Sequence, residues 1–140
     1  MIDINTGHLV IDKERIITPQ SKLATVESWE LGSFQTTQQM ADGWALVEVK
    51  NLLIQGLYIN ISFRFYGQKI DGFTFVFQNK PYEMNPSWES WSKEVEQANL
   101  VRFNNWLKEQ FGEVGALEWG KIHALYDAKS AASSIQLNYI

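Results

Sequence analysis

The chain has 140 residues, of which 45% are apolar and 20% are charged, and this length and balance are typical of one folded globular domain spanning residues 1–140. It contains no cysteine, which excludes disulfides, thiol nucleophiles and thiolate metal sites. Sixteen acids against twelve bases give a net charge of −4, so no nucleic acid partner is expected. The N-terminus lacks a signal peptide pattern and the apolar runs are too short for a membrane span, which predicts a cytoplasmic protein with no membrane association.

Short elements are expected in the first 40 residues. Alternating residues around a glycine predict a β-hairpin over residues 2–11. Ser21 is the predicted N-cap of a short helix that ends near Trp29 or Glu30. Residues 32–40 are rich in glutamine and threonine and predict a loop or an irregular sheet edge.

The middle of the chain predicts a sheet. Strict alternation over residues 57–66 is the clearest strand signal, and residues 44–49 and 73–78 alternate in the same way. A turn is predicted over Gly67 to Gly72, before the last of these strands, with Asp71-Gly72 as its signal. The side chains expected on the buried face are Leu57, Ile59, Ile61, Phe63, Phe65, Phe73, Phe75 and Phe77. An antiparallel meander covered on one side follows from this pattern.

A long helix is predicted in the C-terminal half, capped by Ser87 and running from Trp88 to Phe111. Its apolar side chains cover roughly 200° of the circumference, a width that needs cover from more than one side. They are Trp88, Trp91, Val95, Leu100, Phe103, Trp106, Leu107 and Phe111. Gly112 is expected to end this helix. Strands over residues 118–127 and 134–140 follow, with Tyr126 expected to pack inward and Asp127 to accept backbone hydrogen bonds in the turn between them. The predicted fold class is α+β: a curled antiparallel sheet of about five to seven strands on one long helix, plus a short N-terminal helix.

No catalytic motif emerges from the residues able to do chemistry. His123 and Asp127 share a strand face about 13 Å apart, too far for a base and the carboxylate that orients it. The chain has no Gly-x-Ser-x-Gly elbow and no glycine-rich phosphate loop. No catalytic residue, metal site or cofactor is therefore predicted.

The helix carboxylates are expected to serve structure. Glu94 and Glu96 are two positions apart and point to different faces, which disfavours a glycosidase-like pair. Glu96 falls inside the apolar stripe, and a carboxylate there needs a partner. An ion pair with Arg102 or Arg64 is the predicted solution.

The last third of the chain carries a set of short motifs. They are Trp106-Leu107 late in the helix, Trp119-Gly120 before a strand, Tyr126-Asp127 at its end, Ser133-Ser134-Ile135 at the start of the last strand, and a terminal Tyr139. Over residues 87–140 this pattern resembles a group of small bacterial proteins of uncharacterised function. Some proteins of this look and size are regarded as immunity proteins of bacterial toxin systems, so the resemblance implies an immunity-like role.

The sequence therefore favours a noncatalytic protein-binding module, an inhibitor or immunity-type partner of another bacterial protein. Residues 81–127 hold eight acids and four bases, and such an acidic region would steer a basic partner. Tyrosine, tryptophan and arginine are enriched at binding hot spots. The candidate contact residues are Tyr58, Arg64, Tyr66, Trp119 and Lys121.

Two other interpretations stay open at this point. The first is a small-molecule binder or enzyme with an apolar pocket between sheet and helix, lined by Phe63, Phe75 and Trp106. The second is a homodimer built through exposed strand edges. A filled core would argue against the pocket, and light scattering would test the dimer.

Overall fold

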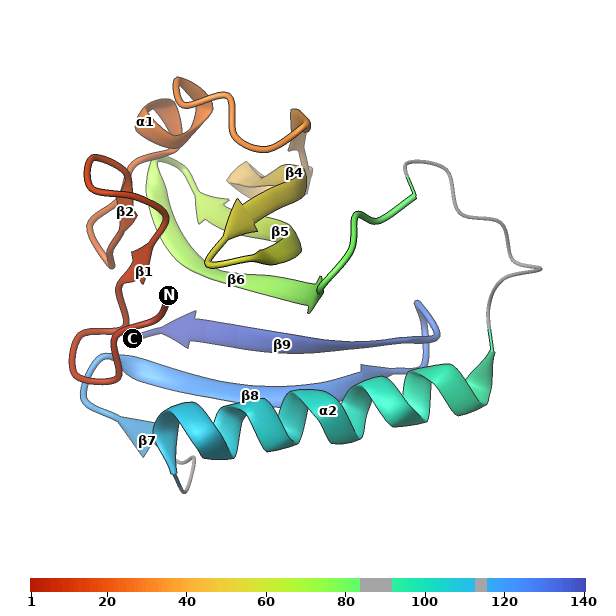
Figure 1. The fold of residues 1–140 in the computed structure, drawn as a ribbon. Helices are drawn as coiled ribbons and strands as arrows, with labels where there is room; N and C mark the ends of the chain where they lie inside the picture. Colours follow the sequence, from red (N-terminus) through yellow and green to blue (C-terminus); the bar gives the residue numbers. More distant parts are fainter. Residues whose placement is uncertain (84–91, 113–115) are drawn as a thin grey trace.

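The computed structural model describes residues 1–83, 92–112 and 116–140. Its main sheet is antiparallel and seven-stranded, in the order β3-β4-β5-β6-β9-β8-β7, and β1 and β2 form a second, small sheet (Figure 1). The strands are β1 (Leu9–Val10), β2 (Ile16–Ile17), β3 (Phe34–Gln39), β4 (Trp44–Ile54), β5 (Leu57–Tyr66), β6 (Lys69–Gln78), β7 (Ala116–Leu117), β8 (Gly120–Asp127) and β9 (Ala132–Tyr139). The helices are α1 (Leu23–Glu27), a 3₁₀ turn η1 (Ala41–Gly43) and α2 (Lys93–Phe111). The predicted α+β class, with an antiparallel sheet and a long helix in the C-terminal half, is confirmed.

One face of the main sheet is apolar and buried. In β5 the alternation works as predicted, because Ile59, Ile61, Phe63 and Phe65 are all buried. The three phenylalanines of β6 are buried in the same way. They belong to one hydrophobic cluster that also includes buried side chains of the N-terminal segment, α2, β8 and β9. The two halves of the chain therefore share a core.

Helix α2 lies along β8 and β9, the two C-terminal strands (Figure 1). Only Phe103, Leu107 and Phe111 are buried on it, a stripe with a spacing of four residues. Of the other predicted stripe residues on this helix, Leu100 and Trp106 are half-buried and Val95 is 53% exposed. The predicted wide apolar stripe is wrong for the described helix, because the sheet covers only one of its sides.

The ends of α2 are fixed by local chemistry. Ser92 is the N-cap, and its hydroxyl accepts a hydrogen bond from the Val95 N–H at 3.2 Å. The predicted cap Ser87 and the predicted first turn from Trp88 lie outside the described residues. Gly112 ends the helix at a positive φ of 72°, as predicted. Neither described helix is long and apolar enough to cross a membrane.

Two predicted boundaries in the sheet are wrong. The chain turns at Gly67, and Asp71-Gly72 lies inside β6, where the pairing with β5 shifts register. The Asp-Gly pair marks a β-bulge there, a structure with the same local sequence preference as a turn. Residues 32–40 were predicted as a loop or irregular edge. They contain the regular edge strand β3, which pairs with β4 along its whole length.

The N-terminal segment contains the predicted turn and the predicted short helix, but the helix has a different N-cap residue. Asp3 N–H donates to the His8 carbonyl at 2.9 Å, which closes the predicted turn, while β1 pairs mainly with β2. Lys22, not the predicted Ser21, is the N-cap of the five-residue α1. The Ser21 hydroxyl is engaged elsewhere, because it accepts a hydrogen bond from Thr18 N–H.

The C-terminal hairpin is confirmed. Strands β8 and β9 pair in continuous antiparallel register. Asp127 accepts a hydrogen bond from Lys129 N–H at 2.9 Å and so organises the turn, as predicted. Tyr126 was expected to pack inward, but it is 41% exposed because it lies at the end of β8 beyond the body of the core.

Candidate functional site

The second face of the main sheet carries polar and half-buried side chains, in contrast to the buried face. We call it the open face and define it by the outward-pointing residues of five strands. They are Trp44, Leu46, Glu48 and Lys50 of β4; Tyr58, Asn60, Ser62, Arg64 and Tyr66 of β5; Thr74, Val76 and Gln78 of β6; Ser134, Gln136 and Asn138 of β9; and Lys121, His123 and Leu125 of β8. None of these side chains is fully buried. A contiguous solvent-facing surface of this kind is available to a partner.

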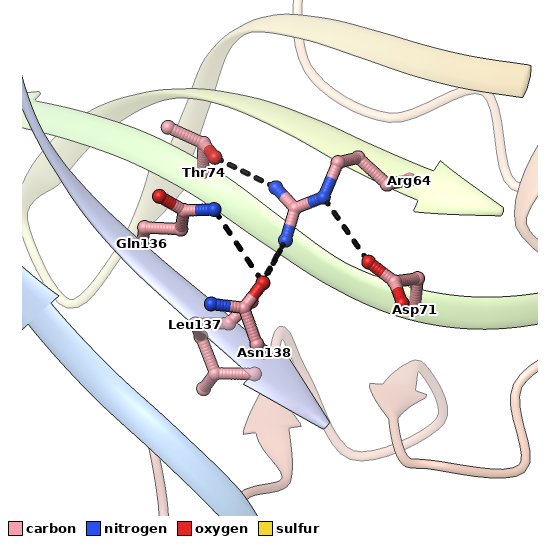
Figure 2. A network of polar contacts seen from close by, with 6 residues as sticks. All are labelled: Arg64, Asp71, Thr74, Gln136, Leu137 and Asn138. Atoms are coloured by element: carbon pink, nitrogen blue, oxygen red, sulfur yellow. Dashed lines mark hydrogen bonds and ion pairs between the residues drawn. The ribbon is translucent and has the colours of Figure 1, made fainter. Parts of the chain in front are cut away.

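A network around Arg64 ties three strands together across the open face (Figure 2). The guanidinium donates to Thr74 Oγ1 and to Asn138 Oδ1, each at 2.8 Å, and to the Leu137 carbonyl at 3.1 Å. Asp71 lies farther away, with 3.5 Å between its Oδ2 and the Arg64 Nε. The side chain of Arg64 is 19% exposed. Neutral oxygen atoms on β6 and β9 therefore accept most of the hydrogen bonds of the Arg64 guanidinium. These bonds fix the guanidinium in one orientation.

Gly72 makes room for this network. A Cβ at this position would lie 2.2 Å from the Leu137 carbonyl oxygen and 2.6 Å from Arg64 Nη2. Only glycine therefore lets β9 and the guanidinium approach β6 this closely. The same bulge turns Asp71 toward Arg64.

A shallow hollow lies at the centre of the open face, beside the Arg64 network. Its volume is about 180 Å³. The side chains that line it from the open face are Glu48, Lys50, Asn60, Ser62, Thr74, Val76 and Ser134. Such a surface offers hydrogen-bond donors, hydrogen-bond acceptors and side chains of both charges. Across the described residues, no group of three or more His, Cys, Asp and Glu side chains is placed to hold a metal ion.

An aromatic pair stands at one end of the open face. Trp44 and Tyr66 are opposite each other in β4 and β5, with 5.2 Å between ring centroids. Trp44 is 38% exposed and Tyr66 is 59% exposed. Met40, which is 46% exposed, precedes them and donates its N–H to the Trp44 carbonyl. Large exposed side chains next to one another on a polar face are typical of an interaction site.

Four of the five predicted contact residues lie on the open face. Tyr58, Arg64 and Tyr66 line up along β5, and Lys121 is exposed on β8. The sequence prediction did not include Trp44. Trp44 follows the Asp42-Gly43 turn and starts β4, and the register of β4 with β5 sets it opposite Tyr66.

Trp119, the fifth predicted residue, lies away from the open face. Its indole N–H donates to the Ile4 carbonyl at 2.8 Å. Its ring packs on Gly7, where a Cβ would lie 2.4 Å from the ring, and on Tyr139 at 6.1 Å between centroids. These contacts show that Trp119 fastens the N-terminal turn to the end of the C-terminal hairpin.

The two tyrosines with perturbed acidity are structural. Burial raises the pKa of Tyr82 to about 12, against the smaller opposing effect of the neighbouring Arg102. Burial also raises the pKa of Tyr139, whose hydroxyl donates to the Gly7 carbonyl at 2.7 Å. Both hydroxyls hold their protons at neutral pH, so neither can act there as a base.

The predicted ion pair of Glu96 is wrong in the described part of the chain. Its carboxylate accepts a hydrogen bond from Ser133 N–H at 2.7 Å, and the Ser133 hydroxyl donates to the Glu96 carbonyl at 2.8 Å. Arg102 instead stacks on Phe77 and Phe103, with its Cζ at 4.9 and 4.8 Å from the ring centroids. The carboxylate therefore docks the first turn of α2 onto the hairpin.

Comparison with known proteins supports the fold. One similar solved chain belongs to the structure of Rhs1-CT in complex with cognate immunity protein RhsI1, with a TM-score of 0.57 and 14% identity. The alignment covers 99% of this chain and 85% of that chain. At this identity the likeness is one of fold. No family model matches the chain, and no curated protein does either.

Proposed function

We propose that this chain is a noncatalytic protein-binding module of the immunity type, which binds and neutralises a bacterial toxin domain in the cytoplasm. Its fold is similar to that of a chain from a complex containing an immunity protein, over 99% of this chain and 85% of that chain. The C-terminal motifs that resemble immunity-like bacterial proteins support the same proposal. The aromatic pair and polar hollow on one uncovered face give such a partner a place to bind.

The open face supports this proposal because its exposed side chains are of the types found at protein-binding sites. Trp44 and Tyr66 offer rigid aromatic area, while Tyr58 and Lys121 offer polar groups at other positions on the face. In this account Arg64 positions its neighbours, and it contacts the partner only through the exposed edge of its guanidinium. Trp119 serves the fold.

The proposal predicts that a toxin domain is encoded beside this chain in its own genome, and the binding test uses that domain. Coexpression should restore growth of cells that produce this domain, and the two purified proteins should form a stable complex by calorimetry. Changing Trp44 and Tyr66 together to alanine should weaken binding by about 30-fold or more, the effect of losing one hot spot. A neighbouring toxin that is neither bound nor neutralised would contradict the proposal.

The control variant removes exposed apolar side chains elsewhere. Val95 and Val101 lie on α2, away from the open face, and are more than half exposed. Changing both to alanine should leave the affinity within about threefold, because rim or remote positions contribute little. Equal losses in the two variants would show that the open face has no special role.

A small-molecule binder is the second candidate, supported by one groove. Phe77, Ala98, Val101, Arg102, Asn105, Trp106 and Glu109 line a space of about 360 Å³ between β6 and α2. This volume is at the lower end of the range for ligand sites. The core space near Met1, Leu9 and Phe75 admits no water molecule and offers no such site. Saturable binding of anilinonaphthalene sulfonate to the folded protein, lost in Val101→Arg, would favour this candidate.

A further inference from the structure

Strand β3 leaves one edge of the main sheet open. It is the terminal strand of the sheet and is six residues long, whereas β7 at the other edge has two residues. Natural edge strands are commonly protected by lysine, proline, a bulge or a very short length. Strand β3 has none of these: its sequence is Phe-Gln-Thr-Thr-Gln-Gln and its pairing with β4 is regular. Such an edge is a template for an added strand.

The register indicates which backbone groups face outward. Met40 N–H donates to the Trp44 carbonyl, so this pair is hydrogen-bonded. Hydrogen-bonded pairs alternate along an antiparallel ladder. The N–H and C=O groups of Thr37 and Gln39 therefore point away from β4, toward the open edge.

A hollow with two carboxylates lies along this edge. Its volume is about 430 Å³, and Glu27 and Glu30 are the charged residues among those lining it, which otherwise run from Leu31 to Thr37. The Thr37 hydroxyl donates to Glu27 Oε2 at 2.8 Å, which places this carboxylate directly beside the strand. Among the residues that the structure describes, none that lines the hollow is basic. An added strand would therefore meet negative charge.

The wall of the hollow is held in place by one side chain. The Gln35 amide donates to the Glu27 carbonyl at 3.2 Å, and its Oε1 accepts from Leu31 N–H at 2.7 Å. These bonds tie the segment after α1 to β3. The backbone that carries the two glutamates is thus positioned before a partner arrives, which lowers the cost of binding.

We propose that the β3 edge accepts an extended, lysine- or arginine-rich segment of the partner protein as an additional strand. This inference rests on the proposed function and names the kind of segment that the partner supplies. Backbone hydrogen bonds to Thr37 and Gln39 provide affinity, and Glu27 and Glu30 select for positive charge. A second copy of this chain is disfavoured on this edge, because antiparallel pairing about the centre of β3 would bring the two Glu27 carboxylates together.

The test uses a blocked peptide, Lys-Val-Lys-Thr-Lys-Val-Lys, and the same peptide with every lysine replaced by glutamate. Amide hydrogen exchange is followed by NMR on the full chain. The basic peptide should slow exchange at Thr37 and Gln39 and bind more weakly as salt rises. Glu30→Lys should weaken its binding about tenfold, the equivalent of 1.4 kcal/mol. The matched control Glu118→Lys, in the exposed turn between β7 and β8 at the opposite edge of the sheet, should leave the affinity unchanged.

Three results would overturn the proposal: equal binding of the acidic peptide, protection elsewhere with none on β3, or β3 protection that rises with protein concentration in the absence of peptide. The last would assign the edge to a second copy. Thr37→Pro removes an outward N–H and should abolish peptide binding in a variant whose melting curve shows that it is folded. If Thr37→Pro and Glu30→Lys bind the toxin domain like the wild type, the edge proposal fails while the proposed function stands. If the peptide binds β3 but no toxin is neutralised, the edge proposal stands while the proposed function fails.

Discussion

Replacing Arg64 with alanine tests the network at the centre of the open face. The variant loses two 2.8 Å hydrogen bonds to side-chain oxygens of β6 and β9. Bonds to a charged group are worth about 1.5–3 kcal/mol each when buried, but water can reach the acceptors on this face, so we count about 1 kcal/mol for each. The distant and half-exposed Asp71 adds little. The free energy of unfolding should fall by about 2 kcal/mol.

This loss should be visible in thermal and chemical unfolding. A fall of about 2 kcal/mol corresponds to a lower melting temperature by roughly 8 °C for a domain of this size. Asp71→Asn is the matched control and should cost less than about 0.5 kcal/mol. The reasoning is refuted if Arg64→Ala unfolds with wild-type stability, or if Asp71→Asn costs as much as the loss of the arginine.

Three further predictions concern the core and its ionisable groups. Phe103→Ala should cost about 3–5 kcal/mol in urea unfolding, because the ring is buried, while Val101→Ala on the exposed side of the same helix should cost under about 0.5 kcal/mol. Gly72→Ala should cost more than about 2 kcal/mol in the same assay, because its Cβ would collide with the Leu137 carbonyl and the strands must separate. Burial raises the folded-state pKa of Tyr139 above the usual value near 10, so its contribution to stability is complete below about pH 10 and is lost as the pH rises through the folded pKa.

Each of these has an outcome that would count against it. Similar losses for the two α2 variants would mean that the helix is covered on both sides. A neutral Gly72→Ala would mean that β6 and β9 are not in close contact. For Tyr139, the measurement is the free energy of unfolding between pH 8 and pH 12, with Tyr139→Phe as control. The variant should show a shallower decline above pH 10, and identical slopes would show that the hydroxyl is not buried.

Several elements of the sheet could be predicted because their sequences alternate strictly. Residues 57–66 have one wholly apolar face, and β5 occupies this range. The polar edge strand β3 gave no such signal, because it has a neighbour on one side only and buries none of its six side chains fully. Asp71-Gly72 was misassigned as a turn because a bulge and a turn favour the same residues.

Positions set by long-range contacts could not be predicted. The indole N–H of Trp119 is bound to Ile4 at the far end of the chain, a partner that spacing along the sequence does not reveal. Glu96 was expected to form an ion pair with an arginine, but its carboxylate accepts a hydrogen bond from the backbone N–H of Ser133. The polar face of β5 was predictable, since Tyr58, Arg64 and Tyr66 alternate with core residues. The hollow along β3 could not be predicted from the sequence, because it depends on the hydrogen bond by which Gln35 holds the preceding segment against the strand.

The central claim is that the open face and the β3 edge bind a toxin domain. Hydrogen–deuterium exchange on the purified chain, alone and with the toxin domain encoded beside it, measures this directly. The account predicts slowed exchange in β3 and in the strand ends that carry Trp44 and Tyr66, and unchanged exchange in the exposed part of α2 near Val101. Protection centred on α2, or no change anywhere at saturating toxin, would contradict it.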